Sequence, residues 1–306
     1  MSDDTSQVDH GEGYRVGTVA LVGRPNAGKS TLMNRLVGSK LSIVSDKPQT
    51  TRHRIHGVLS EARGQIVFVD TPGVHRPHFR MNERMMKVTR TALADVDAVV
   101  VMIDASEPLG GGARYLLDLV GQVRCPVILA LNKADSVPKP SLLPLMDRLR
   151  NEREFADIVP MSALDGDNVD ALLSALFAAM PVGPPLFPED ALTDRSVRFL
   201  AAERVREQLL HRTREELPYS TAVVIDRWVE PEEGRQVEIS ATIYVDKDSQ
   251  KPIVIGKGGR VLKAVGTAAR REIADLIGQP VDLRLWVKVR PQWREKSAFL
   301  DSMDIT

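Results

Sequence analysis

An eight-residue segment of the chain carries the residue types needed to hold a row of phosphates: Gly23, Arg24, Pro25, Asn26, Ala27, Gly28, Lys29 and Ser30. Its spacing is the G-x-x-x-x-G-K-[ST] pattern of a phosphate-binding loop, or P-loop. The glycines allow a tight loop whose backbone N–H groups point inward at the phosphates. Lys29 is expected to reach the β- and γ-phosphates, and the Ser30 hydroxyl is expected to bind Mg²⁺.

The residues on either side of this loop fit the same role. Residues 16–22 form an apolar run typical of a buried strand, and residues 31–37 carry apolar side chains at helical spacing. The alternative is a Gly-rich turn that matches by chance. The order strand, loop, helix makes the nucleotide-binding interpretation the better one.

A second motif, Asn132-Lys133-Ala134-Asp135, could select the base, because it follows the apolar run 126–131. Guanine presents two adjacent donors, N1–H and N2–H, and the Asp135 carboxylate could accept from both. Asn132 is expected to tie this loop to the P-loop, and the Lys133 stem to cover the base. Farther along lies a loop whose backbone could recognise guanine O6, formed by Met161, Ser162 and Ala163.

Two further segments could surround the terminal phosphate. In Asp70-Thr71-Pro72-Gly73, Asp70 would hold Mg²⁺ through a water and the Gly73 N–H would approach the γ-phosphate. The other segment is Gln49, Thr50, Thr51, Arg52 and His53. Its Thr51 would supply a hydroxyl ligand to Mg²⁺, although ordinary loop polarity would also explain these threonines. The five motifs in this order predict a guanine-nucleotide site.

The residue after Gly73 departs from a common hydrolytic pattern. Many GTPases place Gln there to orient the attacking water, whereas this chain has Val74. We therefore expect slow intrinsic hydrolysis, with Lys29, Thr51 and Gly73 as catalytic candidates. Asn26 is a candidate ligand for a monovalent cation such as K⁺; the alternative is that it only shapes the loop.

Length and composition agree with an intracellular two-domain protein. The chain has 306 residues, with 41 Lys and Arg against 41 Asp and Glu, so its formal net charge is zero. Overall charge therefore does not attract the protein to nucleic acid or to a membrane surface. Its one cysteine excludes an internal disulfide. It has neither a signal peptide nor an apolar run of about 18 residues, so we expect a cytoplasmic protein. Residues 1–14 read as a disordered tail.

The first domain is expected to span residues 15–181 as a doubly wound, mostly parallel α/β sheet. Short apolar runs alternate with helical patterns, which is typical of βαβ units. The expected strands are 16–22, 65–69, 98–103, 126–131 and 158–159, and the expected helices include 82–93, 113–120, 142–151 and 169–180. Residues 182–194 are Pro-rich and are predicted to link the domains.

Residues 195–306 are expected to form a smaller α+β domain. A helix over 196–216 precedes two strands, 221–229 and 236–245, joined by the turn 230–234. A glycine loop, a basic helix over 260–277 and a strand over 281–289 follow. The order α-β-β-α-α-β suggests a type II KH domain followed by a C-terminal extension.

The glycine loop has the GXXG pattern that clamps a single-stranded RNA backbone in KH domains. We expect it to bind RNA through Ile255, Gly256, Lys257, Gly258 and Gly259, extended by Arg260 and Lys263. Taken alone, GXXG is often only a turn. Trp293 could stack on a base, and the alternative is that it packs inside the domain.

The motifs resemble those of translation-factor-related small GTPases. Residues 49–53 and 70–74, followed by the second domain, resemble the Era family in particular, over nearly the whole chain after the tail. The resemblance implies a Mg²⁺-dependent GTPase that binds 16S rRNA near its 3′ end and the 30S subunit. It also implies roles in rRNA processing and small-subunit biogenesis, and peripheral association with the cell membrane. We expect a monomer.

Two alternatives remain at this point. One is an RNA-binding regulator that uses GTP only as a conformational ligand, with negligible turnover. The other is a signalling GTPase at the membrane surface, which the GXXG loop and the lack of a lipidation motif disfavour. GTP turnover measured with and without RNA separates the first alternative from an assembly GTPase.

Overall fold

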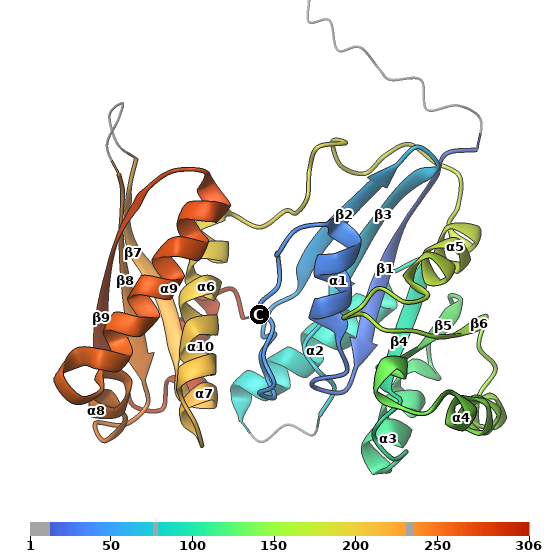
Figure 1. Cartoon of the computed structure of the whole chain (residues 1–306), viewed down its shortest axis with the longest axis horizontal. Coiled ribbons are helices and arrows are strands. Elements are labelled where there is room, and N and C mark those ends of the chain that lie inside the picture. The colour runs from blue at the N-terminus through green and yellow to red at the C-terminus, as the bar shows by residue number, and fades with distance from the viewer. Residues whose placement is uncertain (1–12, 76–78, 231–235, 306) are drawn as a thin grey trace, which may run out of the picture.

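The computed structural model describes residues 13–75, 79–230 and 236–305 (Figure 1). Within these ranges the chain forms a six-stranded sheet followed by a three-stranded sheet. Nearly all of the tail expected over 1–14 lies outside the described residues, as does most of the turn expected over 230–234.

The larger sheet is mostly parallel, as the alternating sequence pattern predicts. Its strand order is β2-β3-β1-β4-β5-β6, and β2 alone pairs in the antiparallel direction, with β3. The strands are β1 (Arg15–Gly23), β2 (Ile55–Glu61), β3 (Gly64–Asp70), β4 (Ala98–Asp104), β5 (Val127–Asn132) and β6 (Asp157–Pro160).

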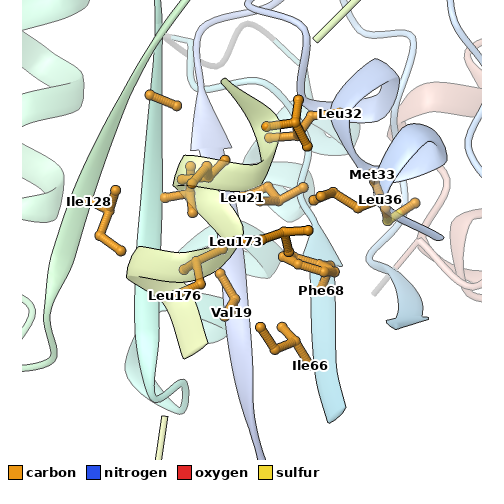
Figure 2. Packing of buried hydrophobic residues seen from close by; sticks show 14 of the residues in the cluster. Val19, Leu21, Leu32, Met33, Leu36, Ile66, Phe68, Ile128, Leu173 and Leu176 are labelled. Carbon is orange, nitrogen blue, oxygen red and sulfur yellow. The ribbon is translucent and has the colours of Figure 1, made fainter. Parts of the chain in front are cut away.

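Helices cover both faces of this sheet because successive strand residues point to opposite sides. Val19 and Leu21 of β1 pack with residues of α1 (Lys29–Val37) and α5 (Val169–Ala179) on one face (Figure 2). Ala20 and Val22 join the core on the other face. That face is covered by α2 (Arg80–Ala94), α3 (Gly111–Val120) and α4 (Lys139–Glu152). Because β1, β3, β4, β5 and β6 run in the same direction, their carboxyl ends lie at one edge of the sheet.

The sequence prediction missed β2, which is one of the two edge strands of the sheet. Residues 55–61 mix His, Ser and Glu with apolar side chains, so neither a continuous apolar run nor a clean alternation marks them. The strand is fixed instead by a tight hairpin, since Glu61 pairs with Gly64 across two turn residues. An edge strand needs less apolar surface because one of its sides is not covered by another strand.

The Pro-rich segment 182–194 lies along the first domain and is bonded to it. The buried amide of Gln65 accepts hydrogen bonds from the N–H groups of Leu186 and Phe187 and donates to the Phe187 carbonyl at 2.8 Å. The Val58 N–H donates to the Leu192 carbonyl at 2.9 Å. Extended backbone with prolines can run beside a sheet in this way because its polar groups find partners there.

The second domain has the predicted order of helices and strands. It contains α6 (Val197–Arg212), α7 (Leu217–Ser220), β7 (Ala222–Val229), β8 (Val237–Val245), α8 (Gln250–Ile255), α9 (Arg260–Ile277) and β9 (Val281–Val289). β8 pairs with β7 in the antiparallel direction and with β9 in the parallel direction. Side chains of α6 and α9 share one core with this sheet. The fold class is thus confirmed.

The last residues join the two domains. A turn of 3₁₀ helix, η3 (Trp293–Glu295), and the short α10 (Ser297–Asp301) place Trp293, Phe299 and Leu300 in one cluster with Met81 and Met85 of α2. No helix in the described ranges combines the length and apolar character that crossing a bilayer requires.

Candidate nucleotide and RNA sites

A pocket of about 440 Å³ lies where the parallel strands end. Ligands in doubly wound sheets bind at this edge. The pocket brings together residues from every nucleotide motif that the sequence predicts: Pro25, Asn26, Gly28, Lys29, Ser30, Gln49, Thr50, Thr51, Gly73, Asn132, Lys133, Asp135, Ser162 and Ala163. The other predicted residues do not line it: Gly23, Arg24, Ala27, Arg52, His53, Asp70, Thr71, Pro72, Val74, Ala134 and Met161.

The P-loop is curled by two residues with positive φ, Asn26 at 64° and Gly28 at 98°. The ammonium of Lys29 is buried and donates to the carbonyls of Gly23 at 3.2 Å and Arg24 at 3.1 Å. Burial lowers the pKa of Lys29 to about 8, while the nearby Asp70 carboxylate acts in the opposite direction. An added phosphate charge would favour the protonated form further.

Two hydroxyls and one carboxylate converge beside the P-loop. Asp70 Oδ2 accepts from Ser30 Oγ at 2.7 Å and from Thr51 Oγ1 at 3.5 Å, and the two hydroxyl oxygens lie 2.9 Å apart. Asp70 Oδ1 is buried and has no hydrogen-bond partner among the described residues. Burial raises the pKa of Asp70, and Lys29 opposes this. Oxygen donors of this kind fit Mg²⁺, which also takes phosphate oxygens and water.

Gly73 lies against the P-loop, and Val74 points away from it. A Cβ on Gly73 would lie 2.8 Å from the Pro25 nitrogen, so no larger residue fits without movement. The Val74 N–H donates to the Gly23 carbonyl at 2.9 Å, and its side chain is buried in the core with Met86. Residue 74 therefore has no side-chain access to a water in the pocket.

Thr71 and Pro72 connect this turn to the protein interior. The Thr71 hydroxyl donates to the Leu21 carbonyl at 2.8 Å, and the Pro72 carbonyl accepts from the Thr89 hydroxyl. Both were included among the predicted GTP-binding residues. Their bonds place them behind Gly73, where they hold its loop.

Asn132 connects three loops of the pocket. Its Nδ2 donates to the Ala27 carbonyl at 2.8 Å, which is the bond to the P-loop that the sequence predicts. Its Oδ1 accepts from the Ala163 N–H at 2.8 Å. The Ala163 N–H is therefore already engaged, and a contact with guanine O6 requires this bond to be shared or exchanged. The Ala134 N–H donates to the Met161 carbonyl, which joins the same two loops again.

The sequence prediction gave no role to Asp104, the last residue of β4. Its Oδ2 lies 2.5 Å from Lys133 Nζ, and its Oδ1 accepts from the Ser106 N–H and hydroxyl. Burial opposes ionisation of Asp104, but its bonds to Lys133 and Ser106 outweigh this effect and lower the pKa of the carboxyl. Asp104 pairs with Asn132 in the sheet register. The sequence did offer a signal for this role, because Asp104 is an acidic residue at the end of the apolar run 98–103.

Arg35 on α1 also supports the base-binding side of the pocket and was missed. Its Nε donates to the Ala163 carbonyl at 2.7 Å, and its Nη2 bonds the Leu164 carbonyl. Sequence alone offered no signal, because a basic residue in the last turn of a helix is common.

Asp135, the residue predicted to select the base, is exposed at the pocket. The Ser136 hydroxyl donates a hydrogen bond to its carboxylate at 2.8 Å.

Arg52 and His53 were predicted to bind GTP, and the structure places both against the second domain. Arg52 is buried and donates to the carbonyls of Thr221 at 2.7 Å and Pro218 at 3.0 Å. The His53 ring packs edge-on against Phe199 of α6. These two residues follow Thr51 directly, so the chain passes from the pocket into the domain interface within two residues.

The GXXG loop combines three glycines with positive φ: Gly256 at 75°, Gly258 at 61° and Gly259 at 76°. A Cβ on Gly256 would lie 2.5 Å from Val261 Cγ2, so this glycine lets α8 and α9 approach each other. Nothing lies within 4 Å of a Cβ built on Gly258 or Gly259. Their backbone conformation, and not crowding, explains why glycine suits these two positions.

Positive charge surrounds this loop. Lys257, Arg260 and Lys263 are exposed, and the last two line an open groove of about 910 Å³ between α6 and α9. Arg212 and Arg271 line the same groove, together with the two acids Glu272 and Asp275, so basic side chains outnumber acidic ones there. Such a surface suits a phosphate backbone.

Trp293 does not belong to this surface. It is fully buried, and its indole N–H donates to the Ser220 carbonyl at 2.9 Å. The proposal that it stacks on a base is therefore wrong for this structure, and the alternative of a packing residue holds.

Comparison with known proteins agrees with this geometry. The family model described as "50S ribosome-binding GTPase" matches residues 18–133, and the model described as "KH domain" matches residues 216–294. A crystal structure of Era in complex with MgGDPNP and nucleotides 1506–1542 of 16S ribosomal RNA is 40% identical. The match covers 96% of this chain and 99% of that one, with a TM-score of 0.93. The chain belongs to the Era family.

A second Era structure supports the same assignment. A point variant of Aquifex aeolicus Era bound to GDP·AlF₄⁻ is 41% identical, with a TM-score of 0.92 and coverage of 95% of this chain and 99% of that one. As an Era-family protein, the chain is a GTPase with a C-terminal KH domain. The resemblance inferred from its motifs is thereby confirmed.

Proposed function

We propose that this protein is a GTP-hydrolysing ribosome assembly factor that binds 16S rRNA near its 3′ end and acts on the 30S subunit. Its role would be in rRNA processing and small-subunit biogenesis. The observation that carries this proposal is the match, over nearly the whole chain, to an Era structure that holds both MgGDPNP and 16S rRNA nucleotides.

The nucleotide half of the proposal assigns roles to the pocket residues. Backbone N–H groups of residues 24 and 26–30 would hold the phosphates, with Lys29 on the β- and γ-oxygens. Asp135 would accept from guanine N1–H and N2–H, and Lys133 would cover the base. Gly73 would bring its N–H to the γ-phosphate, supported by its contact with Pro25.

Ser30, Thr51 and, through a water, Asp70 would hold Mg²⁺. The convergence of their oxygens and the unpaired Asp70 Oδ1 support this assignment. The bound ion would neutralise charge on the β- and γ-phosphates. Mg²⁺ usually takes only a few protein ligands beside substrate phosphates and waters, so retention of the ion would depend on the phosphates.

Intrinsic hydrolysis would be slow, because the Val74 side chain is buried in the core and cannot orient water. Asn26 could assist by binding K⁺ through its amide oxygen: its Nδ2 donates to the Asp46 carbonyl at 2.6 Å, which leaves Oδ1 as the atom that could bind the ion. The alternative is that Asn26 only connects the P-loop to residue 46. If Asn26 binds K⁺, GTP turnover should be faster in K⁺ than in Na⁺. Equal rates in the two salts would exclude a K⁺-binding role for Asn26.

The RNA half rests on the GXXG loop. Ile255, Gly256, Lys257, Gly258 and Gly259 would clamp a single-stranded segment, with Arg260 and Lys263 on neighbouring phosphates. We propose that the protein works as a cytoplasmic monomer, with its domains divided by the segment 182–194. Peripheral association with the cell membrane stays a prediction of the family resemblance, which flotation with anionic vesicles would test.

The decisive experiment measures GTP turnover with and without an RNA that contains the 3′ end of 16S rRNA. We expect Mg²⁺-dependent turnover that the RNA changes, and no turnover in a Lys29→Met variant that still binds the RNA. Turnover that stays negligible under every condition would favour the GTP-gated RNA regulator. Absence of RNA binding would remove the assembly role.

A further inference from the structure

Helix α6 of the KH domain reaches the loop that carries Thr51. The guanidinium of Arg206 donates to the backbone carbonyl of Thr50 through Nη2. The same guanidinium forms a two-pronged pair with Glu203, with Nε at 2.7 Å from Oε1 and Nη2 at 2.6 Å from Oε2. Glu203 thus fixes the orientation of Arg206, and Arg206 fixes the carbonyl before Thr51.

The residue after Thr51 is held by the same domain. Arg52 donates to the carbonyls of Thr221 and Pro218, as described above. Thr51 therefore lies between two neighbours that both bond to the second domain. The Thr51 hydroxyl itself faces the first domain, 2.9 Å from Ser30 Oγ.

The groups that make these bonds are buried. Side chains of Arg206 and Glu203 are only 3% and 6% exposed, and residue Arg52 is 2% exposed. A surface ion pair would add little to the position of a loop. A buried bidentate pair has few alternative partners, and breaking it leaves an unpaired charge in the interior, so its geometry is strongly maintained.

Neighbouring residues of α6 hold the start of the same segment. Glu207 Oε1 accepts from the Val44 N–H at 2.9 Å, and Glu207 Oε2 lies 2.6 Å from Lys40 Nζ. Arg204 bonds the Lys40 carbonyl. The first domain supplies its own anchor at this end, since Asn34 Oδ1 accepts the N–H groups of residues 41 and 42. Bonds from α6 therefore matter most at the other end of segment 40–52, where Arg206 holds the Thr50 carbonyl.

We propose that Arg206 and Glu203 are positioning residues for the GTPase site, supplied by the KH domain, and that they place the Thr51 hydroxyl. This inference rests on the metal-binding role of Thr51 in the proposed function. It makes the RNA-binding domain a structural part of the nucleotide site. Separation of α6 from residues 40–52 would release Thr51, while the P-loop and base contacts would stay intact.

The test uses full-length protein with Glu203→Gln and Arg206→Met combined, so that neither member of the pair stays charged without the other. Arg206→Lys keeps the charge and one donor and serves as the conservative variant. Arg198→Met on an exposed position of the same helix is the control. The first readout is amide hydrogen exchange of residues 40–52 without nucleotide. The second is the Mg²⁺ concentration that gives half-maximal binding of GTP and of GDP.

We expect the double variant to exchange residues 50–52 faster and to need about tenfold more Mg²⁺ for GTP, as for other residues that orient metal ligands. GDP affinity without Mg²⁺ and the Arg198→Met protein should match wild type, and Arg206→Lys should fall between. Unchanged exchange at residues 50–52 in a folded variant would overturn the proposal. If the double variant does not fold, the amide exchange of residues 50–52 is compared between the Arg206→Lys and Arg198→Met proteins. Equal exchange in these two proteins would likewise overturn the proposal. Failure of wild type to bind GTP would instead overturn the proposed function, because the exchange comparison needs no nucleotide.

Discussion

Lys133 Nζ lies 2.5 Å from Asp104 Oδ2, so the lysine expected to cover the base is held by the end of the adjacent strand. The Lys133 backbone is in the left-handed region, with φ of 61°, and Lys133 lines the pocket. Asp104 thereby limits the positions that the Lys133 stem can take. Its carboxylate is buried and bonded to Ser106, which keeps it in place.

Asp104→Asn should weaken binding of both GTP and GDP by about 1–2 kcal/mol, because it removes a charged hydrogen bond to Lys133. Turnover at saturating GTP should change little, since no phosphate contact is altered. The measurement is a double-mutant cycle with Lys133→Met, read as nucleotide affinity. Ser106→Ala, which keeps the N–H bond to Asp104, is the control. Additive effects of Asp104→Asn and Lys133→Met would show that Asp104 does not act through Lys133.

Asp135→Asn should shift base preference from guanine toward xanthine nucleotides. The amide replaces one acceptor by a donor, which suits xanthine O2 and leaves a guanine N–H unmatched. We expect GTP affinity to fall by at least roughly 100-fold, as in sites built around a specific hydrogen bond. Competition titrations with GTP and XTP measure the shift. A GTP preference equal to wild type would remove Asp135 from the base contact.

Val74→Gln should not restore fast hydrolysis, because residue 74 points into the core and not into the pocket. The buried amide should lower the free energy of unfolding by about 1–3 kcal/mol. Val74→Met, of similar size but apolar, separates polarity from volume. Urea unfolding and GTP turnover of both variants give the comparison. A clear increase of turnover in the Gln variant alone would mean that this loop can turn toward the γ-phosphate.

Lys257→Asp with Gly258→Asp should abolish most RNA binding and leave GTP affinity near wild type. Two carboxylates would repel the phosphate backbone, and loss of Lys257 should reduce the slope of log affinity against log salt by about 1. Asp tolerates the positive φ at position 258, so the fold should survive. RNA gel shifts over a salt series and nucleotide titrations on the same protein test this.

The matched control carries the same change of charge on the first domain. Gln122→Asp with Arg124→Asp alters an exposed loop after α3, far from α8 and α9 (Figure 1). This variant should bind RNA nearly as well as wild type. Equal loss of RNA binding in both variants would point to net charge, not to the GXXG loop.

The sequence predicted those parts of the site where local pattern decides the structure. The P-loop, the 132–135 loop and the GXXG loop each follow or precede an apolar run, so strand and helix periodicity placed them correctly. The bond from Asn132 to the Ala27 carbonyl followed from the same logic. Asn132 ends β5 and Ala27 follows β1, so the bond depends only on parallel strands that end at the same edge of the sheet.

Other residues were misplaced because their surroundings come from distant parts of the chain. Arg52 follows Thr51 and would be expected to stay near the phosphates, yet its partners are carbonyls near residue 220. Trp293 is covered by α2 of the first domain, which no local pattern reveals. Arg206 and Glu203 received no role from the sequence, since their bonds depend on the packing of α6 on residues 40–52.

The central claim is that one chain joins a GTP site to recognition of the 16S rRNA 3′ end. Crosslink mapping on small-subunit rRNA in the presence of Mg²⁺ and a non-hydrolysable GTP analogue tests it most directly. The account predicts crosslinks from the GXXG loop concentrated near the 3′ end of 16S rRNA, and their loss in the Lys257→Asp/Gly258→Asp protein. Crosslinks spread over other regions of the rRNA, or unchanged in that variant, would contradict it.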